Sequence, residues 1–208
     1  HRGTTEANIT TKPEWFYNEP TFSNGKLVTP RKWSWAIPHA RFYAVFPQVK
    51  NEYTKIKLSP ETYEGSPYIE FEAETDVTNQ KDLMTACSGH VHYSVQGTAP
   101  RTDLDFRHAL TAIKFAVGQN LSINKTISKV EIRNALSKGK YTLSDKFDGT
   151  GAKWENLSDA KTFKLEGLAV STNQNPNAVL TGNDGDNYTF YMIPQELTGK
   201  NITVYVEF

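Results

Sequence analysis

The sequence predicts an all-β protein of the sandwich or barrel type. Apolar residues recur mostly at every second position, a period typical of half-buried strands and not of amphipathic helices. The strand-like runs are short, and groups of Gly, Asn, Asp and Ser that favour turns separate them, for example at 23–25, 137–139 and 148–151. Regularly spaced short strands of this kind are typical of two packed sheets or of one closed sheet.

Runs rich in β-branched and aromatic residues give the predicted strands. They cover residues 41–46, 68–72, 91–96, 112–117, 127–133, 139–143, 162–167, 188–193 and 201–208. The last run has the clearest pattern, because Ile202, Val204, Val206 and Phe208 alternate with residues of mixed polarity. One face of this C-terminal strand is therefore expected to be apolar.

The alternation of apolar residues slips once along the chain. Leu104 and Phe106 fit one phase, whereas Ile113, Phe115 and Val117 fit the other. A bulge or a single helical turn between them would absorb the slip. Residues 108–112 are therefore the best helical candidate in a chain where helix is scarce, and we expect one domain over residues 1–208.

The composition excludes several classes of protein. The chain has 208 residues, of which 38% are hydrophobic, and no run of them is long enough to span a membrane. Lys plus Arg and Asp plus Glu number 23 each, without a basic stretch, so nucleic acid is not an expected partner. Cys87 is the single cysteine and can form neither an internal disulfide nor a structural zinc site.

One candidate for metal-dependent catalysis exists among the histidines. His90 and His92 are two residues apart, which on a strand places both rings on one face, and His108 could supply a third ligand for a hydrolytic metal. The favoured interpretation is a solvated strand face. We therefore expect no enzyme activity, no catalytic residues, no metal and no cofactor.

Aromatic side chains form two dense groups near the N-terminus. Trp15 and Tyr17 belong to one group, and Trp33 and Trp35 to the other. Facing water, these rings would form a platform on which sugars stack, and a glycan-binding surface module is the second functional hypothesis. Packing within the protein is the favoured interpretation of the same rings.

Ordered motifs along most of the chain resemble the fimbrillin family of Bacteroidetes, which includes type V pilus subunits and fimbrillin-like lipoproteins. They are Trp33-Ser34-Trp35, Ala40-Arg41-Phe42-Tyr43-Ala44-Val45-Phe46-Pro47, Pro67-Tyr68-Ile69-Glu70-Phe71, Gln80-Lys81-Asp82-Leu83-Met84-Thr85-Ala86, Leu104-Asp105-Phe106-Arg107-His108-Ala109-Leu110-Thr111-Ala112-Ile113-Lys114-Phe115, and Tyr191-Met192-Ile193-Pro194-Gln195 with Leu197 and Gly199. Their order along the chain, more than any one of them, carries the resemblance.

The resemblance implies a transthyretin-like Greek-key β-sandwich that is exported to the cell surface and the outer membrane. It also implies a stalk, anchor or tip component of fimbriae that acts in cell adhesion. Family members that polymerise do so after Arg-specific proteolysis, when a strand from another subunit fills a groove. The expected partners are therefore other pilus subunits, by strand exchange, and no direct membrane span is expected.

The sequence departs from the family pattern at both ends. The leader and the lipidated Cys are not present, and the family's later C-terminal portion does not follow Phe208. The chain is therefore expected to correspond to the N-terminal domain, with Ile202, Val204, Val206 and Phe208 as a candidate assembly edge. The alternative is a non-polymerising surface lipoprotein that binds a host or bacterial glycan or protein through Trp15, Tyr17, Trp33 and Trp35.

Overall fold

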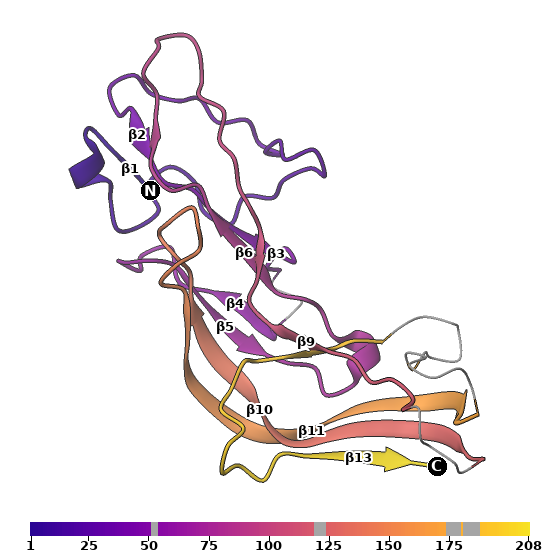
Figure 1. The fold of residues 1–208 in the computed structure, drawn as a ribbon. Helices are drawn as coiled ribbons and strands as arrows, with labels where there is room; N and C mark the ends of the chain where they lie inside the picture. The colour runs from indigo at the N-terminus through magenta and orange to yellow at the C-terminus, as the bar shows by residue number, and fades with distance from the viewer. Residues whose placement is uncertain (51–53, 119–123, 174–179, 181–187) are drawn as a thin grey trace. The chain divides into compact units, whose positions relative to one another are not determined.

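The structure, a computed structural model, describes residues 1–50, 54–118, 124–173, 180 and 188–208. These residues form thirteen strands and two short 3-10 turns (Figure 1). Each strand pair with a defined register is antiparallel. The all-β fold class with little helix, predicted from the sequence, is confirmed.

Contacts between residues group the chain into two compact units. Unit 1 comprises residues His1–Phe71, Leu83–Ala109 and Lys140–Glu155. Unit 2 comprises Glu72–Asp82, Leu110–Gly139 and Asn156–Phe208. Each unit is thus assembled from three separate stretches of chain, and the expectation of one domain over residues 1–208 stays a prediction.

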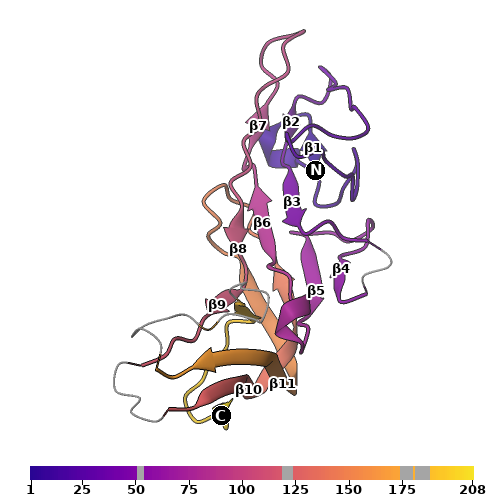
Figure 2. The ribbon, with the colours of Figure 1, turned by 90° about the vertical axis from the view of Figure 1, so that its right-hand side faces the viewer.

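Unit 1 contains a sheet in which β6 (Met84–Cys87) lies between β3 (Tyr43–Phe46) and β8 (Arg107–His108), as Figure 2 shows. Thr85, in its centre, faces Val45 on one side and Arg107 on the other. Val45 and Thr85 are β-branched, a residue type that is common in strands.

Unit 1 also contains a second sheet and a further strand pair. A second sheet has the order β1-β2-β7 and is built from strands of two residues each: β1 (Arg2–Gly3), β2 (His39–Ala40) and β7 (Val91–His92), with η1 (Glu6–Asn8) following β1. In addition, β4 (Ile56–Leu58) pairs with β5 (Tyr68–Glu72), so that buried Ile56 faces buried Phe71. Apolar side chains on both strands therefore contribute to the core of unit 1.

Unit 2 is organised around two long strands. These are β10 (Thr126–Thr142) and β11 (Lys153–Ser171), which lie side by side and also continue into unit 1 (Figure 1). The other elements of unit 2 are η2 (Val77–Asn79), β9 (Thr111–Ile113), β12 (Phe190–Met192) and β13 (Thr203–Glu207). β9 pairs with β12, where fully buried Phe190 faces Ile113.

A left-handed residue shifts the pattern of buried residues along β10. Val130 and Ile132 are buried before it, with Glu131 between them buried on the opposite face, and Ala135 and Ser137 are buried after it, so the face of Val130 and Ile132 continues at odd numbers. Asn134 lies between them with φ 62°, the conformation of a bulge residue, and one added residue accounts for the change. The turn expected at 137–139 is therefore wrong, because those residues lie within β10.

Gly167 produces the same shift in β11. Phe163 and Leu165 are buried before it and Leu168 and Val170 after it, and Gly167 has φ 74°. A glycine adopts this conformation without a steric penalty from Cβ. The strand predicted to end at residue 167 therefore continues to Ser171.

The structure corrects two further expectations. Residues 108–112 form no helix: β8 ends at His108, β9 begins at Thr111, and buried Ala109 and Leu110 connect them. The break between the two strands absorbs the slip in alternation. Of the run predicted at 91–96, only Val91 and His92 are in a strand, because Tyr93 begins a loop.

Candidate assembly edge and aromatic cluster

β13 is an edge strand of unit 2. It pairs with β10 from Lys129 opposite Glu207 to Arg133 opposite Thr203. Among the described residues, no strand pairs with its other edge. The predicted C-terminal strand therefore has one row of backbone N–H and C=O groups without a strand partner in the described part of the chain.

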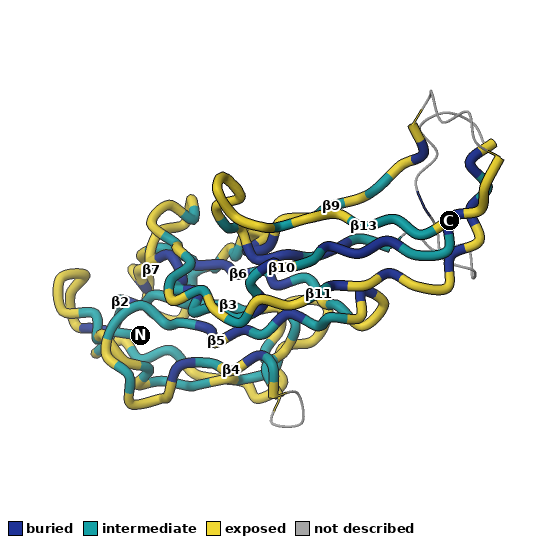
Figure 3. The backbone as a smooth tube through the Cα atoms, turned by 90° about the horizontal axis from the view of Figure 1, so that it is seen from below, coloured by how far each residue is buried: buried dark blue, intermediate teal, exposed yellow. Residues whose placement is uncertain are grey.

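The apolar face of β13 is only partly covered. Val204 lies directly opposite Ile132, and Val206 opposite Val130, so these four side chains share one face of the sheet. The two residues of β10 are buried, whereas Val204 is 55% exposed. Figure 3 shows the corresponding change from largely buried β10 to intermediate and exposed positions along β13.

The two ends of the predicted edge differ in exposure. Phe208 follows the last residue of β13 and is 58% exposed, whereas Ile202 and Val206 are half-buried. The alternation predicted from the sequence thus gives an apolar face that remains open toward the unpaired edge. An added strand with apolar side chains at alternate positions would cover it.

The opposite face of the β10–β13 pair is held by charges. Buried Glu131 accepts a hydrogen bond of 2.6 Å from the guanidinium of Arg133, which in turn lies 3.9 Å from the centre of the Tyr205 ring. Lys129 reaches Glu207 at 2.9 Å. Because both faces of β13 are engaged with β10, the strand is held in the sheet without a partner on its outer edge.

The charges of this face determine how Glu131 titrates. Burial opposes ionisation, but the hydrogen bond and charge of Arg133, with the charges of Lys129 and Lys164, outweigh it, so the pKa of Glu131 lies below its ordinary value. The hydrogen bond from Lys129 likewise lowers the pKa of Glu207. Both carboxyl groups are therefore held in the ionised form that binds the cations of β10.

The side-chain amides of two glutamines from the sequence motifs bond to the backbone of strands in unit 2, as a neighbouring strand would. The Gln80 Oε1 accepts a hydrogen bond of 2.7 Å from the backbone N–H of Tyr191 in β12, and its Nε2 donates to the Glu74 carbonyl at 2.8 Å. Gln195 bonds both backbone groups of Leu136 in β10. These residues have structural roles, which the motif alone did not indicate.

Two of the four predicted sugar-stacking rings, those of Trp15 and Trp33, pack on one another within unit 1. The rings of Trp15 and Trp33 lie 5.0 Å apart, and each lies within 5.7 Å of Phe42. Tyr17 donates a hydrogen bond of 2.8 Å from its hydroxyl to the Ser59 carbonyl. These three rings are half-buried.

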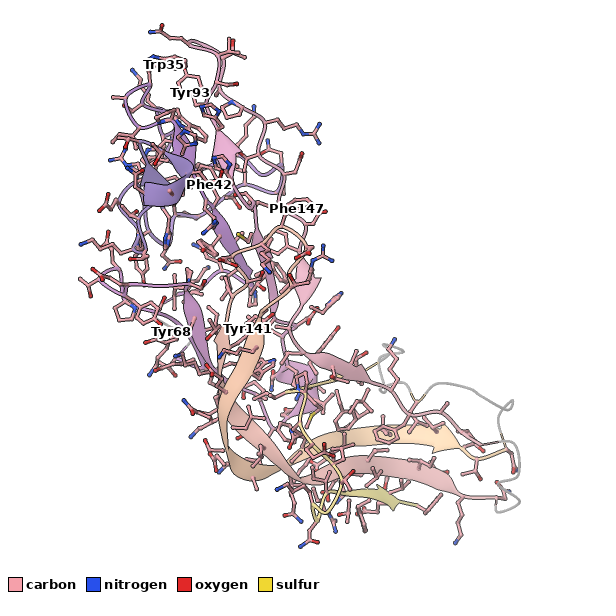
Figure 4. All side chains as sticks on the ribbon, turned by 60° about the vertical axis from the view of Figure 1, so that its left-hand side comes forward. Trp35, Phe42, Tyr68, Tyr93, Tyr141 and Phe147 are labelled. Carbon is pink, nitrogen blue, oxygen red and sulfur yellow. The ribbon has the colours of Figure 1, made fainter. Side chains whose placement is uncertain are left out.

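Trp35 differs from the other three aromatic residues. It is 48% exposed and makes an edge contact with buried Tyr93, with 5.3 Å between ring centres (Figure 4). The Tyr93 hydroxyl accepts a hydrogen bond from the Gly97 N–H at 2.7 Å, which fixes the ring against the following loop. Trp35 is thus the one of the four predicted stacking residues that keeps a largely open ring.

The histidines do not form the proposed metal site. His90 and His92 lie on one side of unit 1 as predicted, with ring centres 6.4 Å apart, but His108 belongs to β8 in another sheet. In the described part of the chain, no three histidine, cysteine or acidic side chains are arranged to hold a metal ion. Burial raises the pKa of the Cys87 thiol, which disfavours the reactive thiolate.

The described residues thus form antiparallel sheets in which one edge of β13 has no strand partner among them. The sequence model of fimbrillin-like proteins matches residues 3–208, and the chain belongs to this family. The resemblance inferred from the motifs is thereby confirmed. Comparison with curated proteins finds no match.

A solved structure supports the fold. The chain is similar to the crystal structure of a fimbrial protein from Bacteroides vulgatus, with a TM-score of 0.50 and 19% sequence identity. The match covers 79% of this chain and 64% of the fimbrial protein, so the chain spans somewhat less than two thirds of that protein's length. None of the helical segments in the described residues is long and apolar enough to cross a membrane.

Proposed function

We propose that this protein is a structural subunit or an accessory stalk, anchor or tip component of type V fimbriae. In this role it contributes to cell adhesion from the cell surface, at the outer membrane, and has no catalytic activity. Its membership of the fimbrillin-like family supports the proposal, as does its similarity in fold to a fimbrial protein.

The open edge of β13 is the observation that carries the proposal. A strand from another subunit, aligned along this edge, would satisfy the unpaired backbone groups and cover the exposed side chains of Val204 and Phe208. The Lys129–Glu207 ion pair and the contact of Arg133 with the Tyr205 ring hold β13 on β10 during this addition, so the incoming strand meets an ordered template. Assembly would thus proceed by donor-strand-type pairing.

The test is a double substitution, Val204→Lys with Phe208→Lys, introduced into the full-length protein in a fimbriated host. Two lysines on this face would oppose burial beneath an added strand. The matched control is Leu197→Lys, because Leu197 is also an exposed apolar residue of unit 2 but lies outside the strands. We expect the double variant to fold and reach the surface but to be absent from fimbriae in electron micrographs. Incorporation equal to that of the control would refute the proposal.

Trp35 supports a second candidate function, a non-polymerising surface lipoprotein that binds a glycan or a host protein. An open indole ring held against a buried tyrosine is suited to stacking on a sugar. We expect the unaltered protein to bind a glycan on an array. Trp35→Ala should abolish this binding, and Phe22→Ala should leave it intact. Phe22 serves as the control because it is similarly exposed. Absence of binding by the unaltered protein would remove this candidate.

A further inference from the structure

Three histidine rings lie together beside the β1-β2-β7 sheet of unit 1. His39 of β2 lies directly opposite His92 of β7, with ring centres 4.2 Å apart and planes 5° from parallel, so these two rings are stacked. His90 lies beside the stacked pair, with its ring centre 5.0 Å from that of His39 and 6.4 Å from that of His92. The stack therefore spans the pairing of β2 with β7.

The histidine group also reaches the N-terminal segment. The His39 Nδ1 and the His90 Nε2 are 2.8 Å apart, and the His90 Nδ1 lies 3.3 Å from a carboxylate oxygen of Glu6 in η1. In the bond between His39 and His90, one ring nitrogen donates and the other accepts. One of the two facing nitrogen atoms must carry no proton, so two cationic rings cannot keep this bond.

The strands of this sheet are short, and backbone bonds between His1 and Arg41 and between Thr10 and Arg2 extend the pairing beside them. β1, β2 and β7 have two residues each, and Gly3 of β1 pairs with His39, the central residue of the stack. Strands this short contribute few backbone hydrogen bonds, so side-chain contacts across them have a large share in stability. Loss of the stack would consequently weaken the pairing of all three strands.

We propose that His39, His90 and His92 form a pH-operated latch that fastens β1 and η1 to the β2–β7 pair and opens in mildly acidic solution. In the closed latch the His39 and His92 rings are stacked and the His39–His90 hydrogen bond is formed. As protons are added, a second cationic ring breaks the His39–His90 bond and repels its parallel neighbour. The N-terminal segment is then released from the sheet.

The groups around His39 determine that the fold loses stability, and does not gain it, as the pH falls. Burial, followed by the charges of His92 and His90, lowers the pKa of His39, while Glu6 acts in the opposite direction. A histidine whose pKa is lower in the folded protein stabilises the fold above its ordinary pKa of 6.5. That stability is lost as the pH falls from 6.5 through the folded pKa.

Hydrogen exchange of the intact chain, followed by mass spectrometry and corrected for intrinsic exchange rates, tests the latch. Between about pH 7.5 and about pH 5, peptides covering residues 1–10 and 36–41 should lose several-fold protection in the unaltered protein and much less in His39→Gln. His108→Gln, in another sheet, is the matched control and should behave like the unaltered protein. An equal loss in His39→Gln and the unaltered protein would overturn the proposal.

A second measurement decides the matter if His39→Gln does not fold. Titration of the histidine ring protons by NMR in the unaltered protein should place the pKa of His39 below 6.5, and a pKa at or above 6.5 would overturn the latch. The α-amino group of His1, whose pKa burial lowers from 8.0 to about 6, titrates over the same range. Because it is common to all these proteins, it does not affect the comparison between them.

Discussion

The side chain of Gln195 pairs with the backbone of Leu136 as a neighbouring strand would. Its Oε1 accepts a hydrogen bond of 2.8 Å from the Leu136 N–H, and its Nε2 donates to the Leu136 carbonyl at 3.2 Å. The same Nε2 also donates to the Ile193 carbonyl at 3.1 Å. One amide therefore satisfies both backbone groups of a residue in β10, next to the bulge at Asn134.

Replacing Gln195 by Ala removes the side-chain amide that bonds to the backbone of Leu136. Both backbone groups of Leu136 would lose their partner, so we expect the free energy of unfolding to fall by about 1–2 kcal/mol. Urea unfolding measures the change, with Gln96→Ala as the control because Gln96 lies in an exposed loop. Equal stability of the two variants would show that water replaces the glutamine at no cost.

Acid should weaken the attachment of β13 through Glu131. The pKa of Glu131 is lower in the folded protein than its ordinary value of 4.5, so its ionised form stabilises the fold above pH 4.5. This contribution is lost as the pH falls below 4.5 through the folded pKa. Glu131→Gln should therefore be less stable than the unaltered protein at neutral pH, and the difference should shrink in acid.

Urea unfolding of the Glu131→Gln variant at several pH values gives this comparison. The control is Glu70→Gln, which removes an exposed carboxylate from β5 without touching the charges around β13. The lowered pKa of Glu131 would be contradicted if the difference in free energy of unfolding between Glu131→Gln and the unaltered protein stayed constant from pH 7 to about pH 3.

The bulge of β10 should tolerate glycine and reject β-branched residues at Asn134. A φ of 62° is accessible to Gly, whereas Val in this conformation costs about 1–2 kcal/mol. We expect Asn134→Gly to change the melting temperature little, even though the 2.9 Å hydrogen bond from Asn134 to the Asn201 carbonyl is lost. Val at the exposed strand position Thr126 is the control and should be tolerated.

Two tryptophans that are close in sequence should respond differently to truncation. Trp33 packs against Trp15, Phe42 and Tyr93, so Trp33→Ala should cost about 2–4 kcal/mol of stability. Trp35→Ala, at a half-exposed position, should cost less than about 1 kcal/mol. Thermal unfolding of both variants measures the difference. A large loss for Trp35→Ala would mean that its ring serves packing and not a ligand.

The sequence predicted strands well where polar and apolar residues alternate without interruption. Residues 68–72 and the C-terminal run are strands close to the predicted bounds. Prediction failed where a glycine or an asparagine lies inside a strand, as at Gly139 and Gly167, because these residues are also typical of turns. Such residues become part of a strand because they pair with neighbouring strands, and those strands are far away in sequence.

The candidate site was predicted in part. Alternation located the apolar face of β13, but an open edge is a property of the sheet and leaves no mark on the strand's own sequence. Glu131 was missed because, within an alternating run, it has the pattern of a solvent-facing residue. His39 was missed because its partners His90 and His92 are about fifty positions away, and only strand pairing brings them together.

Because each unit is built from three stretches of chain, the polypeptide passes from one unit to the other five times, after residues 71, 82, 109, 139 and 155. Three of these crossings lie within strands, in β5, β10 and β11. Neither unit can therefore be cut out as one continuous stretch of chain, in contrast to two domains joined by a single flexible linker.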